Sequence, residues 1–189
     1  MGYALFSRKK NCHARWGPDL RREVLYMASC GSFGMYGLWA MSNADGLLEW
    51  LRGATGAWAY FSAYTYGTHG TACILQSVLS FLSDVVYIDA RSIVHPLDRI
   101  LAIILTGVGM YLEGCIILFA PLSLGQRLLM SAVVTCGLLC HLRAKHGIVT
   151  RDYARYVHNH TIWHVAMVGS MVVPMHAVTF ATTGFEANA

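Results

Sequence analysis

Long apolar stretches constrain the fold of this chain more than any other feature of its sequence. The clearest is 100–120, a run of 21 mostly apolar residues, and others cover 24–41, 71–88, 128–140 and 161–182. Of the 189 residues, 56% are hydrophobic and only 13% are charged. A soluble domain of this length could not bury so much apolar surface. The sequence therefore predicts an all-α fold, a polytopic helical bundle in a membrane.

Composition and turn residues divide the chain into three expected parts. Residues 1–22 are rich in arginine and lysine and form a basic N-terminal tail or targeting segment. Residues 23–90 are expected to add one to three apolar or interfacial helices. Within the first of them, Gly31, Gly34 and Gly37 keep one helix face slim for close packing. Residues 91–184 form the third part, a three-helix body in the membrane.

Prolines and polar links set the limits of the three C-terminal helices. Pro96 suits a helix start, because its missing N–H costs nothing there, and Pro121 ends the first span. The second helix is expected to run to about Tyr153. Residues 157–160 then form a link to the last span, 161–182.

The distribution of charge predicts the orientation of this body. Arg99 begins one span and Asp152 ends the next, so both lie on the same membrane side. The connection between these two spans offers only Arg127. Basic residues are enriched on the cytosolic side of membrane proteins, which corresponds to the matrix in a mitochondrion. That side carries Arg91, Arg99, Arg143, Lys145, Arg151 and Arg155.

His141 and the pair Asp152-Tyr153 form the first candidate site. Eleven residues separate His141 from Asp152, and in one continuous helix they would share a face about 16 Å apart. This face offers an imidazole within the membrane and a carboxylate with a phenol near its edge. Imidazole is an axial ligand of haem iron, and a phenol can donate a hydrogen bond to a carbonyl. The pattern is typical of a haem and quinone site.

His141-x-Arg143, followed by Asp152-Tyr153 and preceded by His95-x-x-Asp98-Arg99, resembles the small cytochrome b membrane-anchor subunit of succinate dehydrogenase (complex II). The resemblance implies that His141 ligates haem b, Arg99 approaches a haem propionate, and Tyr153 with Asp152 binds ubiquinone. It also implies a place in the respiratory chain and the tricarboxylic acid cycle, in the mitochondrial inner membrane. The partners would be membrane lipids, a second membrane anchor, and the iron–sulfur and flavoprotein subunits of complex II, which would carry the succinate chemistry.

A second resemblance points to a different chemistry. His160-Thr161-Ile162-Trp163-His164, followed by Gly169-Ser170, is similar to the last helix of the transmembrane hydrolase superfamily that contains alkaline ceramidases and hemolysin III-like proteins. That resemblance implies zinc held by His160 and His164 with a third histidine. Histidines four residues apart do share one helix face.

Other readings of the histidines and charges remain open. A lone histidine at a helix end is often a hydrogen-bonded structural residue, and the chain would then be a structural accessory subunit of a respiratory complex without a cofactor of its own. The net charge of +4, with no dense basic tract, indicates no nucleic-acid partner. The six cysteines include no Cys-x-x-Cys pair, so an iron–sulfur cluster within this chain is not expected.

Overall fold

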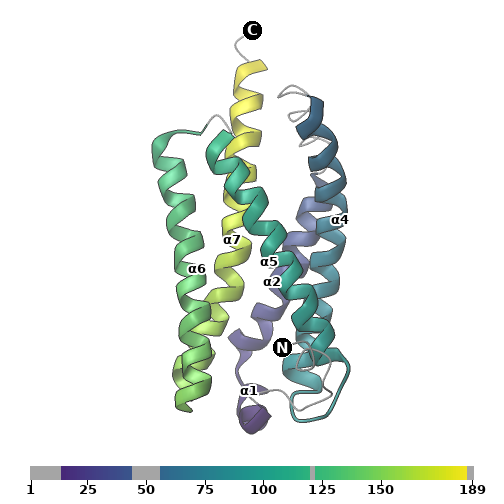
Figure 1. The fold of residues 1–189 in the computed structure, drawn as a ribbon, viewed down its shortest axis with the longest axis vertical. Helices are drawn as coiled ribbons and strands as arrows, with labels where there is room; N and C mark the ends of the chain where they lie inside the picture. The colour runs from purple at the N-terminus through teal and green to yellow at the C-terminus, as the bar shows by residue number, and fades with distance from the viewer. Residues whose placement is uncertain (1–13, 44–55, 120–121, 187–189) are drawn as a thin grey trace.

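The computed structural model describes residues 14–43, 56–119 and 122–186. Every regular element in these ranges is helical (Figure 1), which confirms the all-α prediction. The first described residues form a short 3-10 turn and a one-turn helix, α1 (Gly17–Leu20). The long helices are α2 (Val24–Ser42), α4 (Gly56–Phe81), α5 (Val94–Phe119), α6 (Leu124–Thr150) and α7 (Tyr153–Glu186).

The long helices are arranged as two closely packed pairs. α2 packs along α4 and α6 packs along α7, while contacts between α2 and α7 join the pairs. α5 packs mainly against α4 and makes few contacts with α6, although α6 follows it in the chain. In Figure 1, α5 runs obliquely across the front of the bundle. The separate three-helix body expected for residues 91–184 therefore stays a prediction.

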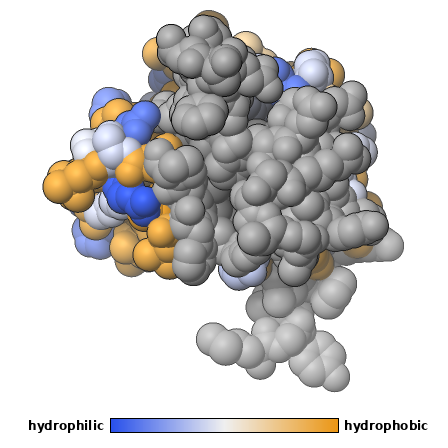
Figure 2. All heavy atoms as spheres, turned by 90° about the horizontal axis from the view of Figure 1, so that it is seen from above, coloured by the Kyte–Doolittle hydropathy of each residue, from blue (hydrophilic) through white to orange (hydrophobic). Residues whose placement is uncertain are grey.

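Two helical segments in the described ranges are long and apolar enough to cross a membrane. They are Gly67–Val86 and Leu124–Thr150. Seen from above the bundle, hydrophobic atoms gather on the flank where α6 lies, with hydrophilic atoms among them (Figure 2). Only the second of these segments belongs to the three C-terminal spans that the sequence predicts, and the other two spans stay predictions. Large apolar side chains exposed along α6 are Leu124, Leu128, Leu129, Leu139, Leu142 and Val149.

The boundary between the last two helices differs from the expectation. α6 ends at Thr150 rather than near Tyr153, and residues 157–160 lie within α7 rather than in a link. Arg151 adopts the left-handed conformation with φ of 61°, and the Asp152 amide donates to the Gly147 carbonyl at 2.9 Å. This pattern closes a helix C-terminus. Asp152 then caps α7, because its Oδ1 accepts the Arg155 amide at 3.0 Å.

This turn changes the geometry of the first candidate site. His141 lies on α6 and Tyr153 on α7, so they do not share the face of one continuous helix. α5 and α6 run antiparallel (Figure 1), so the start of α5 and the end of α6 lie toward the same end of the bundle. Arg99 and Arg151 therefore lie toward one end of the bundle and Arg127 toward the other. Which membrane side this end faces stays a prediction.

Glycines allow both helix pairs to approach closely. A Cβ atom on Gly147 of α6 would lie 2.8 Å from the backbone nitrogen of Tyr156 in α7. On α2, a Cβ at Gly34 would lie 2.9 Å from the Ser77 hydroxyl of α4, and Gly37 also faces α4. The slim face predicted for α2 is therefore confirmed at Gly34 and Gly37. Gly31 is exposed, and a Cβ atom there would meet no other atom within 4 Å.

A widened turn follows α4. Residues Leu82–Val86 are π-helical, and the Tyr87 amide donates to the Leu82 carbonyl at 2.8 Å. Three consecutive side chains of this turn, Ser83, Asp84 and Val85, are buried. Such π turns are rare and occur often at functional sites. Here the turn carries a carboxylate into the middle of the bundle.

The close contact at Gly147 gives a first prediction. Gly147→Ala should destabilise the fold by about 1–3 kcal/mol, since the methyl group meets backbone that cannot move aside. This loss exceeds the gain of about 0.5–1 kcal/mol from replacing a helical glycine. Thermal unfolding in detergent measures the effect, with Gly31→Ala as the matched control that should be neutral or slightly stabilising. An unchanged midpoint for Gly147→Ala would contradict the packing described.

Candidate functional site

A cavity of about 340 Å³ opens between α5 and the α6–α7 pair, and the end of α4 completes it. This volume lies at the lower end of the range for small-molecule sites. Most of its wall is apolar, and a few ionisable groups converge on it. These are Asp84 from the π turn, Asp98 and Arg99 from α5, His141 and Lys145 from α6, and His160 and His164 from α7.

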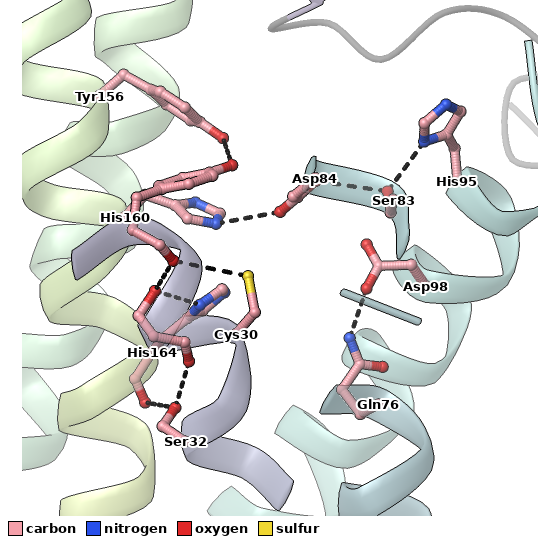
Figure 3. A network of polar contacts seen from close by, with 12 residues as sticks. Cys30, Ser32, Gln76, Ser83, Asp84, His95, Asp98, Tyr156, His160 and His164 are labelled. Atoms are coloured by element: carbon pink, nitrogen blue, oxygen red, sulfur yellow. Dashed lines mark hydrogen bonds and ion pairs between the residues drawn. The ribbon is translucent and has the colours of Figure 1, made fainter. Parts of the chain in front are cut away.

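Asp84 and the two α7 histidines form the polar centre of the cavity. Asp84 Oδ2 lies 3.5 Å from His160 Nε2, and Figure 3 shows the two side chains pointing toward each other across the helix pairs. The rings of His160 and His164 are 4.4 Å apart between centroids. Asp84 is 4% exposed and His164 5%. A carboxylate this deep in an apolar bundle requires polar partners, because an unpaired buried charge is costly.

Hydrogen bonds from α2 hold the ring of His164 in place. Ser29 Oγ lies 3.1 Å from His164 Nδ1 and also donates to the Tyr26 carbonyl at 2.7 Å. The serine hydrogen is thereby used on the carbonyl, so Nδ1 is the donor and Nε2 carries the lone pair of His164. Tyr156 also lines the cavity, and its hydroxyl lies 3.1 Å from that of Tyr26 on α2.

Residues predicted for haem reach the cavity. His141 is half-buried, lines the cavity, and packs on Trp163 with ring centroids 4.6 Å apart. Arg99 lines the same cavity from α5. Together they offer one imidazole and one cation, which fits one axial ligand and one propionate partner. The first glycine after His141 is Gly147. The backbone of Tyr156 fills the space beside it, so a haem macrocycle has no room there.

Residues predicted for ubiquinone lie elsewhere. The Tyr153 hydroxyl donates to Glu23 Oε1 at 3.1 Å, and its ring meets Trp16 edge-on at 5.7 Å. Asp152 caps α7 and pairs with Arg155 at 3.4 Å, so it does not orient the phenol. Neither residue belongs to the described lining of the cavity. Burial, together with the Glu23 carboxylate, raises the pKa of the Tyr153 phenol to about 12, so it stays protonated at neutral pH.

Zinc was the chemistry implied by His160 and His164. Two imidazoles and a carboxylate are donors that zinc accepts, and zinc requires at least three protein ligands. Within the described ranges, no group of three His, Cys, Asp or Glu side chains is placed so that it could hold a metal ion. The described residues thus offer His160 and His164 no third zinc ligand, and the zinc role of this pair stays a prediction.

Asp84 is the residue that the sequence patterns did not single out for a role. A signal was present, because it is the one acidic residue in the apolar stretch 71–88. Ionisable groups within such stretches are rare and commonly functional. Ser29 and Ser83 carried no comparable signal, since serine is common in helices and only the fold brings these hydroxyls to the histidines.

Comparison of the chain with protein-family models, curated proteins and solved structures finds no match.

The position of Tyr153 gives a second prediction. Tyr153→Phe should lower the free energy of unfolding by about 1 kcal/mol, because a hydrogen bond to a carboxylate is lost. The raised pKa means that this contribution is complete below about pH 10 and is lost as the pH rises through about 12. Denaturant unfolding should thus give the same difference between wild type and variant at about pH 7 and about pH 9. A difference that disappears at the higher pH would contradict the assignment.

Proposed function

We propose that this chain is a multi-pass membrane protein that binds a lipid-soluble small molecule and acts on it by acid–base chemistry, as a transmembrane hydrolase-like protein. The observation that carries the proposal is the convergence of Asp84, His160 and His164 on one largely apolar cavity. These side chains come from two separate helix pairs, so the arrangement is a property of the fold and not of one amphipathic helix.

Membrane insertion is supported by three features of the chain. Two segments have the length and apolar composition of a membrane span, and large apolar side chains are exposed along α6. Basic residues also gather toward one end of the antiparallel α5–α6 pair. A cavity bordered by such helices favours a substrate that arrives dissolved in the bilayer.

His160 is the general base in the proposed reaction. When its Nε2–H is turned toward Asp84, its Nδ1 carries the lone pair that can accept a proton from water. The resulting hydroxide equivalent attacks a substrate carbonyl, and the proton returns from His160 to the leaving group. Asp84 stabilises the imidazolium that forms between these steps. The 3.5 Å separation of Asp84 and His160 is long, as catalytic contacts often are before substrate binds.

Arg99 and Lys145 complete the proposed site. They line the cavity from two different helices, α5 and α6. Cationic side chains in such positions can bind a carboxylate or phosphate of an amphiphilic substrate. The substrate class proposed is therefore a lipid ester or amide with an anionic headgroup.

A second candidate function is the membrane anchor of succinate dehydrogenase. It is favoured by one observation, the presence of His141 and Arg99 in the same cavity. In this reading His141 would hold haem iron and Arg99 would neutralise a propionate, with a second anchor subunit completing the site. Haem would supply one-electron transfer. Tyr153 and Asp152 remain proposed ubiquinone contacts only if Tyr153 releases Glu23.

The hydrolase-like function gives a third prediction. His160→Ala and Asp84→Asn should each lower the hydrolysis of fluorogenic anionic lipid esters and amides by roughly 10²–10⁴-fold, the contribution of a positioned general base. The assay uses purified protein in vesicles and measures product release against time.

His158→Ala is the matched control, since His158 lies exposed on α7 two residues before His160. It should keep wild-type activity. Wild-type protein that hydrolyses none of the panel, or an Asp84→Asn variant with full activity, would sink the hydrolase-like proposal.

The anchor function gives a fourth prediction. If it holds, the complex purified from its native membrane should show a b-type absorbance that His141→Ala abolishes or shifts, and flavin and iron–sulfur subunits should co-purify. His146→Ala serves as control, because His146 is exposed on the same helix. Purified complex without haem and without these subunits would remove the anchor function.

A further inference from the structure

Asp84 has a second set of neighbours on the side away from His160. Ser83 Oγ lies 2.9 Å from His95 Nδ1 and 3.4 Å from Asp84 Oδ1. His95 Nε2 lies 3.0 Å from the Ala90 carbonyl oxygen. Ser83 is 1% exposed and His95 is fully buried. Figure 3 shows these side chains as one row that runs from His95 through Ser83 and Asp84 to His160.

The Ala90 carbonyl fixes the tautomer of His95. A carbonyl oxygen only accepts, so His95 Nε2 must carry a hydrogen. In the neutral imidazole Nδ1 is then an acceptor, and the Ser83 hydroxyl must donate its one hydrogen to it. The two distances agree with this direction, because 2.9 Å is a normal hydrogen bond and 3.4 Å is beyond the usual range for hydroxyl donors.

Protonation of His95 reverses the direction of the hydrogen bonds along this row. Both ring nitrogens then donate, and Nδ1–H is given to the Ser83 oxygen. The serine hydrogen is released and turns to Asp84 Oδ1. Asp84 thereby gains a hydrogen bond at Oδ1, so its negative charge is shared between the Ser83 hydroxyl and an imidazolium at His160.

We propose that His95 and Ser83 are positioning residues, which couple the protonation of His95 to the Asp84 carboxylate and through it to His160. Ser83 is the switchable element, since its single hydrogen serves either His95 or Asp84 but not both. This series of hydrogen-bonding groups, the relay from His95 through Ser83 and Asp84 to His160, exists whatever reaction takes place in the cavity. Its catalytic meaning, control of the general base by a buried histidine, rests on the proposed hydrolase-like function.

Other ionisable groups also surround this row, and their charges do not replace the relay. Tyr26 and Cys30 of α2 and His164 of α7 lie within electrostatic reach of Asp84. Asp98, Arg99 and Lys145 face the shared cavity, where Asp98 accepts a hydrogen bond from Gln76 at 2.6 Å. The charges of these groups act on Asp84 through space in the same way whether the Ser83 hydrogen points to His95 or to Asp84. The hydroxyl of Ser83 lies between the two groups, 2.9 Å from His95 Nδ1 and 3.4 Å from Asp84 Oδ1.

Nitrogen NMR of histidine-labelled protein in detergent tests the coupling without any assay of activity. In wild type, His95 should appear as the Nε2–H tautomer at neutral pH. On acidification the ring shifts of His95 and His160 should change together. Ser83→Ala should abolish the shared change, and Ser83→Thr, which keeps the hydroxyl, should restore it.

Ser32→Ala is the matched control, because Ser32 donates to the Ser29 carbonyl on α2 and lies outside the row. It should keep the coupled change. The relay is overturned if His95 and His160 respond independently in wild type, if His95 keeps one tautomer while His160 changes, or if Ser83→Ala leaves the coupling intact. Failure of the hydrolysis assay alone would remove the catalytic meaning and leave this result standing.

Discussion

The contact between Asp84 and His160 is the interaction on which the arrangement of the helices depends. It joins the π turn after α4 to α7, and so connects the two helix pairs, which also meet through the α2–α7 contacts Ser29–His164 and Tyr26–Tyr156. Neither group can be buried without polar company, because the desolvation of a carboxylate in a low-dielectric interior is worth several kcal/mol. This requirement is met by polar neighbours, namely the hydroxyls of Ser29 and Ser83 and the imidazole of His95. Around Asp84 the bundle thus contains a polar region whose members hold one another in place.

Helix content was readable from the sequence, whereas the ends of the helices were only partly so. The apolar runs predicted helices, Pro96 lies in the first turn of α5, and Gly34 and Gly37 form the expected slim face. The end of α6 was missed because Arg151 carries no cue for the left-handed conformation that it adopts. The π turn was likewise hidden, since it depends on tertiary burial of Asp84 and on no local propensity.

The candidate site was predicted in pieces that belonged to different hypotheses. The first resemblance assigns His141 and Arg99 to a haem site, and the second assigns His160 and His164 to a zinc site. All four residues line one cavity. The prediction that Tyr153 and Asp152 share a helix face with His141 assumes one continuous helix, and the turn at Arg151 ends that helix between them. Spacing along a helix predicted which residues share a face only as far as the helix continues. The partners of a buried charge come from other helices, and sequence spacing cannot reveal them.

The approach of α6 to α7 at Gly147 has a consequence for how such a site can diversify. Where two main chains touch directly, their separation is set by backbone atoms and not by the sizes of the side chains between them. α5, by contrast, contributes much of the opposite cavity wall and makes few contacts with α6. Substitutions on α5 can therefore reshape the space while the histidines of α7 keep their positions. If the proposed function holds, the wall formed by α6 and α7 would keep the reacting groups in place while changes on α5 alter which substrate fits.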